Sequence, residues 1–236
     1  MSFDFSMFTR YGGVLFEGLL NTMFICFIGL VLGLIIGAIT CWIKMKFPGW
    51  CSIIANMYIE FFRGTPFLIQ VFLLYYVGPV FGLELSAMAA GIIGLSLYGG
   101  AYFAEIYRSG ILSIPKGQIE AAQALGISET AILFRIVIPQ MLGLIIAPLA
   151  NQIITIVKES AILSVITVTE LTFVGQRAIS ETYNYVEVYT MVAILYWAFV
   201  SSLSFLFGRL EVSATSHLRK KESPPKRFIF FKKQEF

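Results

Sequence analysis

Residues 18–43 read GLLNTMFICFIGLVLGLIIGAITCWI and contain no charged side chain. A helix rises about 1.5 Å per residue, so about 20 apolar residues cross the hydrocarbon core of a bilayer. Four further uncharged windows of comparable length follow along the chain, at residues 64–83, 85–104, 136–157 and 188–208. Five membrane spans are therefore predicted. They must be helices, because an isolated strand in lipid would leave its backbone groups without partners.

The composition excludes a soluble domain of this size. The chain is 58% hydrophobic and only 13% charged, whereas globular chains carry about 25% charged residues. Barrel strands are excluded because period-two alternation is absent and the windows are too long. The single histidine, His217, lies outside the windows, and no cysteine spacing is typical of a metal site. The predicted fold class is all-α and polytopic, with no metal bound.

Lysine and arginine residues predict the orientation in the membrane. Basic residues follow the first and third windows and fill the C-terminal segment. The connection at Glu84 has none, and residues 158–187 contain two against four acids. We therefore expect the N-terminus outside, and the C-terminus, the first turn and residues 105–135 in the cytoplasm.

Three regions are expected along the chain. Residues 1–17 form an outer segment, in which Phe3, Phe5 and Phe8 suggest either an interfacial helical turn or a frayed end. Residues 18–210 form the membrane domain; its second span begins near Ser52 and ends at Gly78-Pro79, and its third is a packing helix rich in small residues. Residues 211–236 form a basic tail. Because the tail adjoins the last span, it fits an anchor to anionic lipid better than a nucleic-acid site.

A short polar segment separates the third and fourth windows. Residues 113–117 predict a turn and residues 118–128 a helix that Gly126 ends or bends. Ile119, Ala122 and either Leu125 or Gly126 fall at helical spacing and form a small apolar ridge. Such a ridge fits a groove on another protein, and a solvated amphipathic linker is the alternative.

The same segment carries a recognisable motif. Glu120-Ala121-Ala122 is followed by Gly126, Ile136 and then Ile138-Pro139, which resembles the signature of permease subunits of bacterial ABC importers. Only Ile138, in place of leucine, departs from it. Further stretches resemble the polar amino acid (histidine, glutamine or arginine type) permeases: EFFRGTP at 60–66, GAYFAEIYR at 100–108, IPKGQIEAA at 114–122, NQI at 151–153, KES at 158–160 and VGQ at 174–176. The resemblance covers residues 12 to 211.

The resemblance implies a transport machine in the bacterial cytoplasmic membrane, with a type I ABC importer permease fold. Two permease subunits, either two copies or this chain and a relative, would pair with a cytoplasmic ATPase dimer and receive an amino acid from an extracytoplasmic solute-binding protein. The chain has no phosphate loop, so ATP and magnesium would be bound by the ATPase and no cofactor by this chain. A coupling helix near 118–130 would contact the ATPase through Gly117, Ile119, Glu120, Ala121, Ala122, Leu125 and Gly126.

Charges next to a span mark the candidate solute path. Lys158 and Glu159 are neighbours that point about 100° apart on a helix, which suits the carboxylate and ammonium of an amino acid. Gln152, Thr155 and Glu159 share one helix face. The predicted solute-contacting set is Arg63, Thr65, Gln70, Gln152, Thr155, Lys158, Glu159 and Ser160. The alternative is that the two charges cap the span or hold a dimer contact.

Two further charges and one amide bear on gating and on the class of solute. Glu105 and Arg108 favour an intrahelical pair over a cytoplasmic gate. The neutral Gln152 favours a neutral or acidic amino acid. Two other classes of protein compete with a permease: an ion-coupled carrier, which would not need a docking helix, and a membrane-embedded enzyme, which would need a catalytic cluster that the spans lack.

Overall fold

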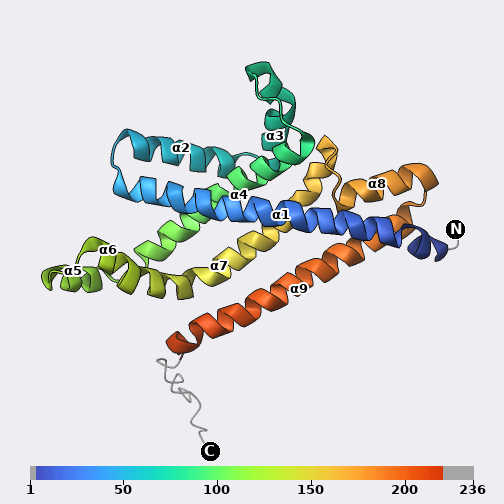
Figure 1. The fold of residues 1–236 in the computed structure, drawn as a ribbon. Coiled ribbons are helices and arrows are strands. Elements are labelled where there is room, and N and C mark those ends of the chain that lie inside the picture. The colour runs from blue at the N-terminus through green and yellow to red at the C-terminus, as the bar shows by residue number, and fades with distance from the viewer. Residues whose placement is uncertain (1–3, 220–236) are drawn as a thin grey trace, which may run out of the picture.

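The computed structural model describes residues 4–219, and every regular element within that range is helical (Figure 1). Four helical stretches are long and apolar enough to cross a membrane: Ser6–Lys46, Ala87–Leu112, Glu129–Ile166 and Tyr185–Val212. The fifth is a helix pair, Trp50–Gly64 with Phe67–Phe81, bent by 112° at its break. The predicted all-α polytopic fold is confirmed, and it has five spans when the bent pair counts as one.

The elements, in chain order, are α1 (Ser6–Lys46), α2 (Trp50–Gly64), α3 (Phe67–Phe72), η1 (Leu73–Val77), η2 (Gly78–Phe81), α4 (Ala87–Leu112), α5 (Lys116–Ala124), α6 (Glu129–Ile132), η3 (Leu133–Val137), α7 (Ile138–Glu159), η4 (Ser160–Ile166), α8 (Leu171–Thr182) and α9 (Tyr185–Arg219). Both α5 and α6 lie at one end of the molecule, and α8 lies with the N-terminus at the other (Figure 1). We name these the α5 end and the α8 end.

A proline explains why the second predicted span is not one helix. Pro66 has no N–H, so the carbonyl of Phe62, four residues earlier, loses its helical partner. The buried side chain of Gln70 replaces that partner. Its Nε2 donates to the carbonyl of Phe62 at 2.9 Å and to that of Thr65 at 3.0 Å. The expectation of a continuous second span is therefore wrong at Pro66, where the chain turns.

Small residues bring α1 and α4 into close contact. Gly29, Gly33 and Gly37 recur every four residues and form a buried stripe on α1. A Cβ atom added at Gly37 would lie only 2.6 Å from the Cβ of Phe103 on α4. Helix backbones approach this closely only where side chains are small. The third predicted span, α4, is confirmed as a packing helix, since it is the most buried of the four long spans.

The two chain ends depart from the expected boundaries. Helix α1 begins at Ser6 and runs without interruption through Gly18, so the expected limit at residue 17 is not a helix limit. Its first turns bury Met7, Tyr11 and Leu15 in a cluster with α8 and α9. Helix α9 likewise continues past residue 211 to Arg219. Phe3 and residues 220–236 of the tail lie outside the described residues.

Candidate functional site

The predicted docking helix is α5, and a glycine ends it. Gly126 has a φ of 73°, a left-handed conformation that glycine adopts without strain. Its N–H donates to the carbonyl of Gln123 at 2.9 Å, and the N–H of Ile127 donates to that of Ala122 at 3.1 Å. This pair of bonds is a Schellman motif. The prediction that Gly126 ends or bends the helix is confirmed, although the helix ends at Ala124 and not at residue 128.

The predicted docking ridge is divided between two faces. A small apolar cluster beneath α5 has as its buried members Ile114, Ala122, Ile132 and Val137. Ile119 packs against the same cluster. The prediction of an outward ridge is therefore wrong for Ala122 and Ile119, because the turn at Gly126 folds α6 against them. The exposed remainder of the predicted set is Gly117, Glu120, Ala121, Leu125 and Gly126. Leu125 is 80% exposed.

The segment that returns from α5 to the membrane is capped and tied to α1. The Ser128 hydroxyl accepts a hydrogen bond from the N–H of Ala131 and caps α6. Lys46 at the end of α1 pairs with Glu129 at 3.0 Å. A π-helical turn, η3, precedes Pro139 at the start of α7. That turn accommodates the proline ring, which would collide with the carbonyl four residues earlier in a regular helix.

A cavity of about 490 Å³ opens between α2, α4 and α7. Three residues of the predicted solute-contacting set line it, namely Arg63, Gln152 and Thr155. The other lining residues are Tyr102, Glu105, Ile106, Arg108, Ser109, Pro148 and Asn151. Residues far apart in the chain thus meet around one polar space of the size that small-molecule sites have.

Two side chains give this cavity its binding capacity. The Nε2 atom of Gln152 is buried and has no hydrogen-bond partner among the described residues. The guanidinium carbon of Arg63 lies 5.3 Å from the ring centre of Tyr102, a cation–π contact. An unpaired buried donor costs free energy unless another group accepts from it. Arg63 is exposed and lines the cavity, so its guanidinium can bind a carboxylate or a carbonyl oxygen there.

Other members of the predicted set have structural roles. Gln70 is only 2% exposed and closes the bend after α2, where its Nε2 also bonds the hydroxyl of Thr65. Ser160 is 1% exposed and donates its hydroxyl to the carbonyl of Val157. None of Thr65, Gln70 and Ser160 lines the cavity, and the Thr65 hydroxyl is engaged in the bend. The Oε1 atom of Gln70 is buried and has no hydrogen-bond partner among the described residues. Gln70 and Ser160 each donate to a backbone carbonyl, so they satisfy backbone groups at these positions.

Lys158 and Glu159 extend the cavity face without lining the cavity. They follow Thr155 by three and four residues on α7, so they lie one helical turn further along. Lys158 is exposed and Glu159 half-buried. In the described part of the chain, neither takes part in an ion pair.

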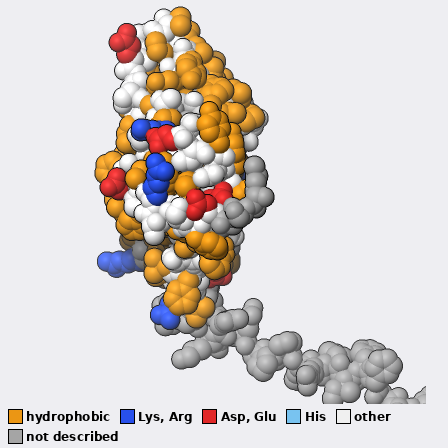
Figure 2. Space-filling model, turned by 90° about the vertical axis from the view of Figure 1, so that its right-hand side faces the viewer, with side chains coloured by type: hydrophobic (Ala, Val, Ile, Leu, Met, Phe, Trp, Pro, Cys, Tyr) orange, Lys and Arg blue, Asp and Glu red, His pale blue; other side chains and the backbone are white. Residues whose placement is uncertain are grey.

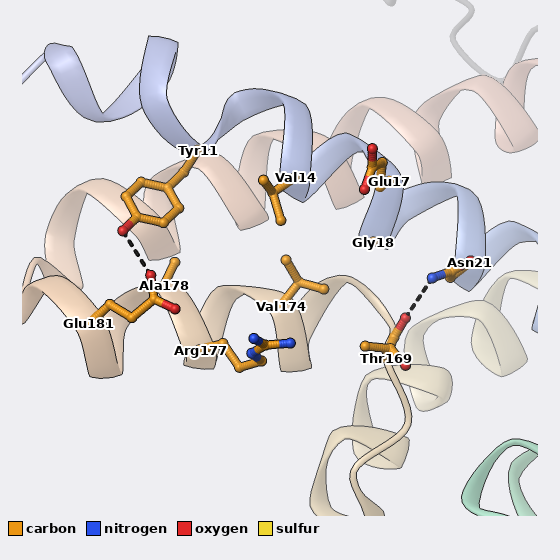
Figure 3. A pocket seen from close by; sticks show the side chains of 10 residues that line it. All are labelled: Tyr11, Val14, Glu17, Gly18, Asn21, Thr169, Val174, Arg177, Ala178 and Glu181. Carbon is orange, nitrogen blue, oxygen red and sulfur yellow. Dashed lines mark hydrogen bonds between the residues drawn. The ribbon is translucent and has the colours of Figure 1, made fainter.

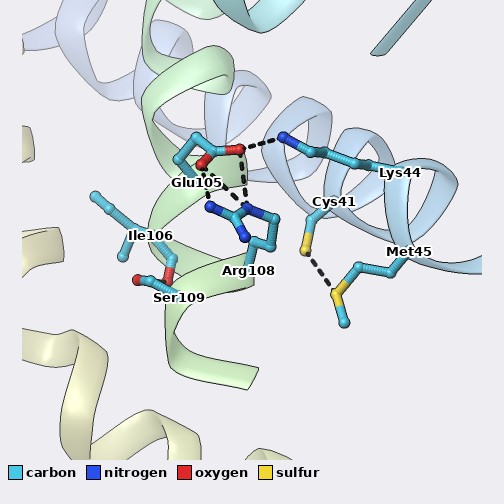
Figure 4. A network of polar contacts seen from close by, with 7 residues as sticks. All are labelled: Cys41, Lys44, Met45, Glu105, Ile106, Arg108 and Ser109. Atoms are coloured by element: carbon cyan, nitrogen blue, oxygen red, sulfur yellow. Dashed lines mark hydrogen bonds and ion pairs between the residues drawn. The ribbon is translucent and has the colours of Figure 1, made fainter. Parts of the chain in front are cut away.

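An ion-pair network borders the cavity toward the α5 end (Figure 4). Arg108 and Glu105 on α4 pair at 2.8 Å, as predicted. Lys44 on α1 adds a contact to Glu105 at 2.7 Å, which the sequence reading missed. Lys44 and Glu105 each stand one residue beyond an uncharged window, so they lie at the same membrane depth. The contact between Lys44 and Glu105 could have been predicted from that spacing. Tyr102 and Asn151 were also missed, although both lie in stretches that resemble the polar amino acid permeases.

Residues 29–214 match the family described as the binding-protein-dependent transport system inner membrane component. The match covers most of the chain, and the chain belongs to this family. It is the permease subunit of an ABC importer and a multi-pass protein of the bacterial cytoplasmic membrane. It is a transport subunit and not an enzyme, since ATP hydrolysis belongs to a separate ATPase.

Particular relatives are similar over nearly their whole length. The putative glutamine transport system permease protein GlnP of Rickettsia typhi is 37% identical over 85% of this chain and 94% of its own. The glutamine transport system permease protein GlnP of Escherichia coli K12 is 36% identical over 89% and 97%. A crystal structure of an amino acid ABC transporter with histidines is 34% identical, with a TM-score of 0.84 over 89% of this chain and 99% of that one.

Proposed function

We propose that this permease carries an amino acid, and that the cavity between α2, α4 and α7 is part of its path. The observation that carries the proposal is that the guanidinium-bearing Arg63 and the amide-bearing Gln152 line one cavity, although they come from different helices. An amino acid always supplies a carboxylate, which accepts from such donors. The relatives named for glutamine transport and the structure with histidines support this class of solute.

The path continues along α7 past the cavity. Gln152, Thr155 and Glu159 lie on one face of the helix, and Lys158 stands beside them. Lys158 can pair with the carboxylate of the solute and Glu159 with its ammonium group. Because neither side chain has an ion-pair partner in the described chain, binding a zwitterion would not require an existing pair to break.

Coupling is assigned to the α5 end, which we place in the cytoplasm from the excess of basic residues there. The exposed docking surface would be Gly117, Glu120, Ala121, Leu125 and Gly126. It would contact an ATPase dimer, which binds ATP and magnesium. A second permease subunit and an extracytoplasmic binding protein complete the transporter.

One experiment separates the two assignments. The complex is purified with its ATPase, reconstituted, and assayed for retained ATPase and for amino acid uptake. Lys158→Ala and Glu159→Gln should keep the ATPase bound and reduce uptake at least about tenfold, since each removes a charged contact to the solute. Leu125→Asp should lose the ATPase, because it places a charge on the docking surface.

Glu84→Gln is the matched control, since it removes an exposed carboxylate away from the cavity and should behave as wild type. Wild-type uptake by both α7 variants would overturn the solute path. Full retention of the ATPase and of uptake by Leu125→Asp would overturn the docking surface.

A further inference from the structure

A second polar recess lies at the α8 end, between α1 and α8 (Figure 3). Its volume is about 310 Å³. Its polar lining comes from Tyr11, Glu17 and Asn21 of α1, and from Thr169, Arg177 and Glu181 on and before α8. The recess is separate from the proposed solute path, because the two cavities share no lining residue.

The walls of the recess are fixed by bonds between the two helices. The Tyr11 hydroxyl donates to the Glu181 carboxylate at 3.0 Å, and the Asn21 amide donates to the carbonyl of Thr169 at 3.0 Å. Gly18 lets the helices meet at the floor, where an added Cβ would lie 3.1 Å from the Cα of Leu171. The recess is therefore preformed, and a partner would not have to order it.

The charges of the recess do not balance. Glu17 and Glu181 supply two carboxylates and Arg177 one guanidinium. None of the three takes part in an ion pair within the described range. Charged side chains do not face hydrocarbon without a large free-energy cost, so the recess opens to water. The α8 end seen in Figure 2 carries acidic and basic side chains among apolar ones.

We infer that this recess receives a basic side chain of the extracytoplasmic binding protein. The inference rests on the proposed function, which places the α8 end outside. The family depends on a binding protein, and that partner must reach the end opposite α5 (Figure 1). The recess carries two carboxylates against one guanidinium, and this net negative charge favours a lysine or arginine of the partner. Complementary charge of this kind mainly sets association rate and salt dependence.

Titrating the reconstituted transporter with its purified binding protein tests the inference through ATPase stimulation. The Glu17→Gln, Glu181→Gln double variant should raise the half-saturating concentration of binding protein about fivefold at low salt, because it removes both carboxylates. Arg177→Gln should lower it, because the recess becomes more negative. Both shifts should shrink at high ionic strength. Basal ATPase activity should stay unchanged, and Glu84→Gln, an exposed acid outside the recess, should stay near wild type.

Shifts of opposite sign are the deciding result, because a purely structural defect would weaken stimulation in both variants. Wild-type half-saturation in both, or a shift in the same direction, overturns the recess as a docking site. Sensitivity of basal ATPase to added inorganic cations, lost in the double variant, would assign the recess to a free ion instead. Failure of the binding protein to stimulate wild type at all would overturn the proposed function itself.

Discussion

At the α8 end, a fully buried carboxylate connects two helices. At the α5 end, the charged side chains that pair across helices remain partly exposed to water. Glu170 is 0% exposed. It accepts from the N–H groups of Thr172 at 2.9 Å and Phe173 at 2.7 Å, and from the hydroxyl of Tyr196 at 2.8 Å. Burial raises the pKa of the Glu170 carboxyl, and these hydrogen bonds oppose that shift. The carboxylate thereby caps α8 and ties it to α9.

The α5 end relies on ion pairs that water and salt can weaken. The side chains of Lys44 and Glu105 are 20% and 17% exposed, and those of Lys46 and Glu129 are 57% and 79% exposed. Exposed pairs contribute about 0 to 1 kcal/mol each and are screened by salt. The difference teaches that the α8 end is held by buried hydrogen bonds, while the ion pairs at the α5 end can rearrange at lower cost.

The largest expected effect comes from removing the buried carboxylate. Glu170→Ala should lower the free energy of unfolding by about 3 kcal/mol, because it deletes the helix cap and leaves buried donors unpaired. Thermal unfolding of the purified protein in detergent measures the change. Glu181→Ala, at an exposed position of the same helix, should cost less than about 1 kcal/mol. Equal losses in the two variants would mean that the α8 end is not held by Glu170.

The next largest effect is expected from a substitution in α1, the helix that connects the two ends. Gly37→Val should destabilise the protein by about 2 kcal/mol, because its side chain would press into Phe103 and force α1 away from α4. Gly12→Val is the matched control in the same helix, since nothing lies within 4 Å of a Cβ there. The same thermal measurement applies. A Gly37 variant as stable as the Gly12 variant would show that close α1–α4 contact is not required.

The smallest effect is expected at the α5 end. Glu105→Gln removes the carboxylate shared by Lys44 and Arg108 and should cost roughly 1 kcal/mol at low salt, and less at high salt. Lys46→Ala, which removes the more exposed pair, should cost no more than about 0.5 kcal/mol. Unfolding measured at two ionic strengths tests both. A loss for Glu105→Gln that matches Glu170→Ala and ignores salt would erase the contrast between the ends.

The number of spans and the end of α5 at Gly126 were predictable because both depend on local residue types. Lipid excludes charge, so uncharged windows mark spans wherever the chain later folds. Gly126 likewise ends α5 for a local reason. The inward turn of Ile119 and Ala122 was not predictable, because it depends on α6 packing beneath α5. Helical spacing identifies a face, and it does not say which neighbour covers that face.

The sequence by itself determined that this chain is a helical permease of an ABC importer, since hydropathy, charge and motif spacing are properties of the residues alone. Only the tertiary structure distinguished Gln70 from Gln152, two amides in uncharged windows. The Nε2 of Gln70 closes the bend at Pro66, whereas Gln152 lines a cavity and its Nε2 has no hydrogen-bond partner among the described residues. The physical reason is that the role of a buried amide depends on the groups around it. For Gln152, those groups come from helices that are far apart in the sequence.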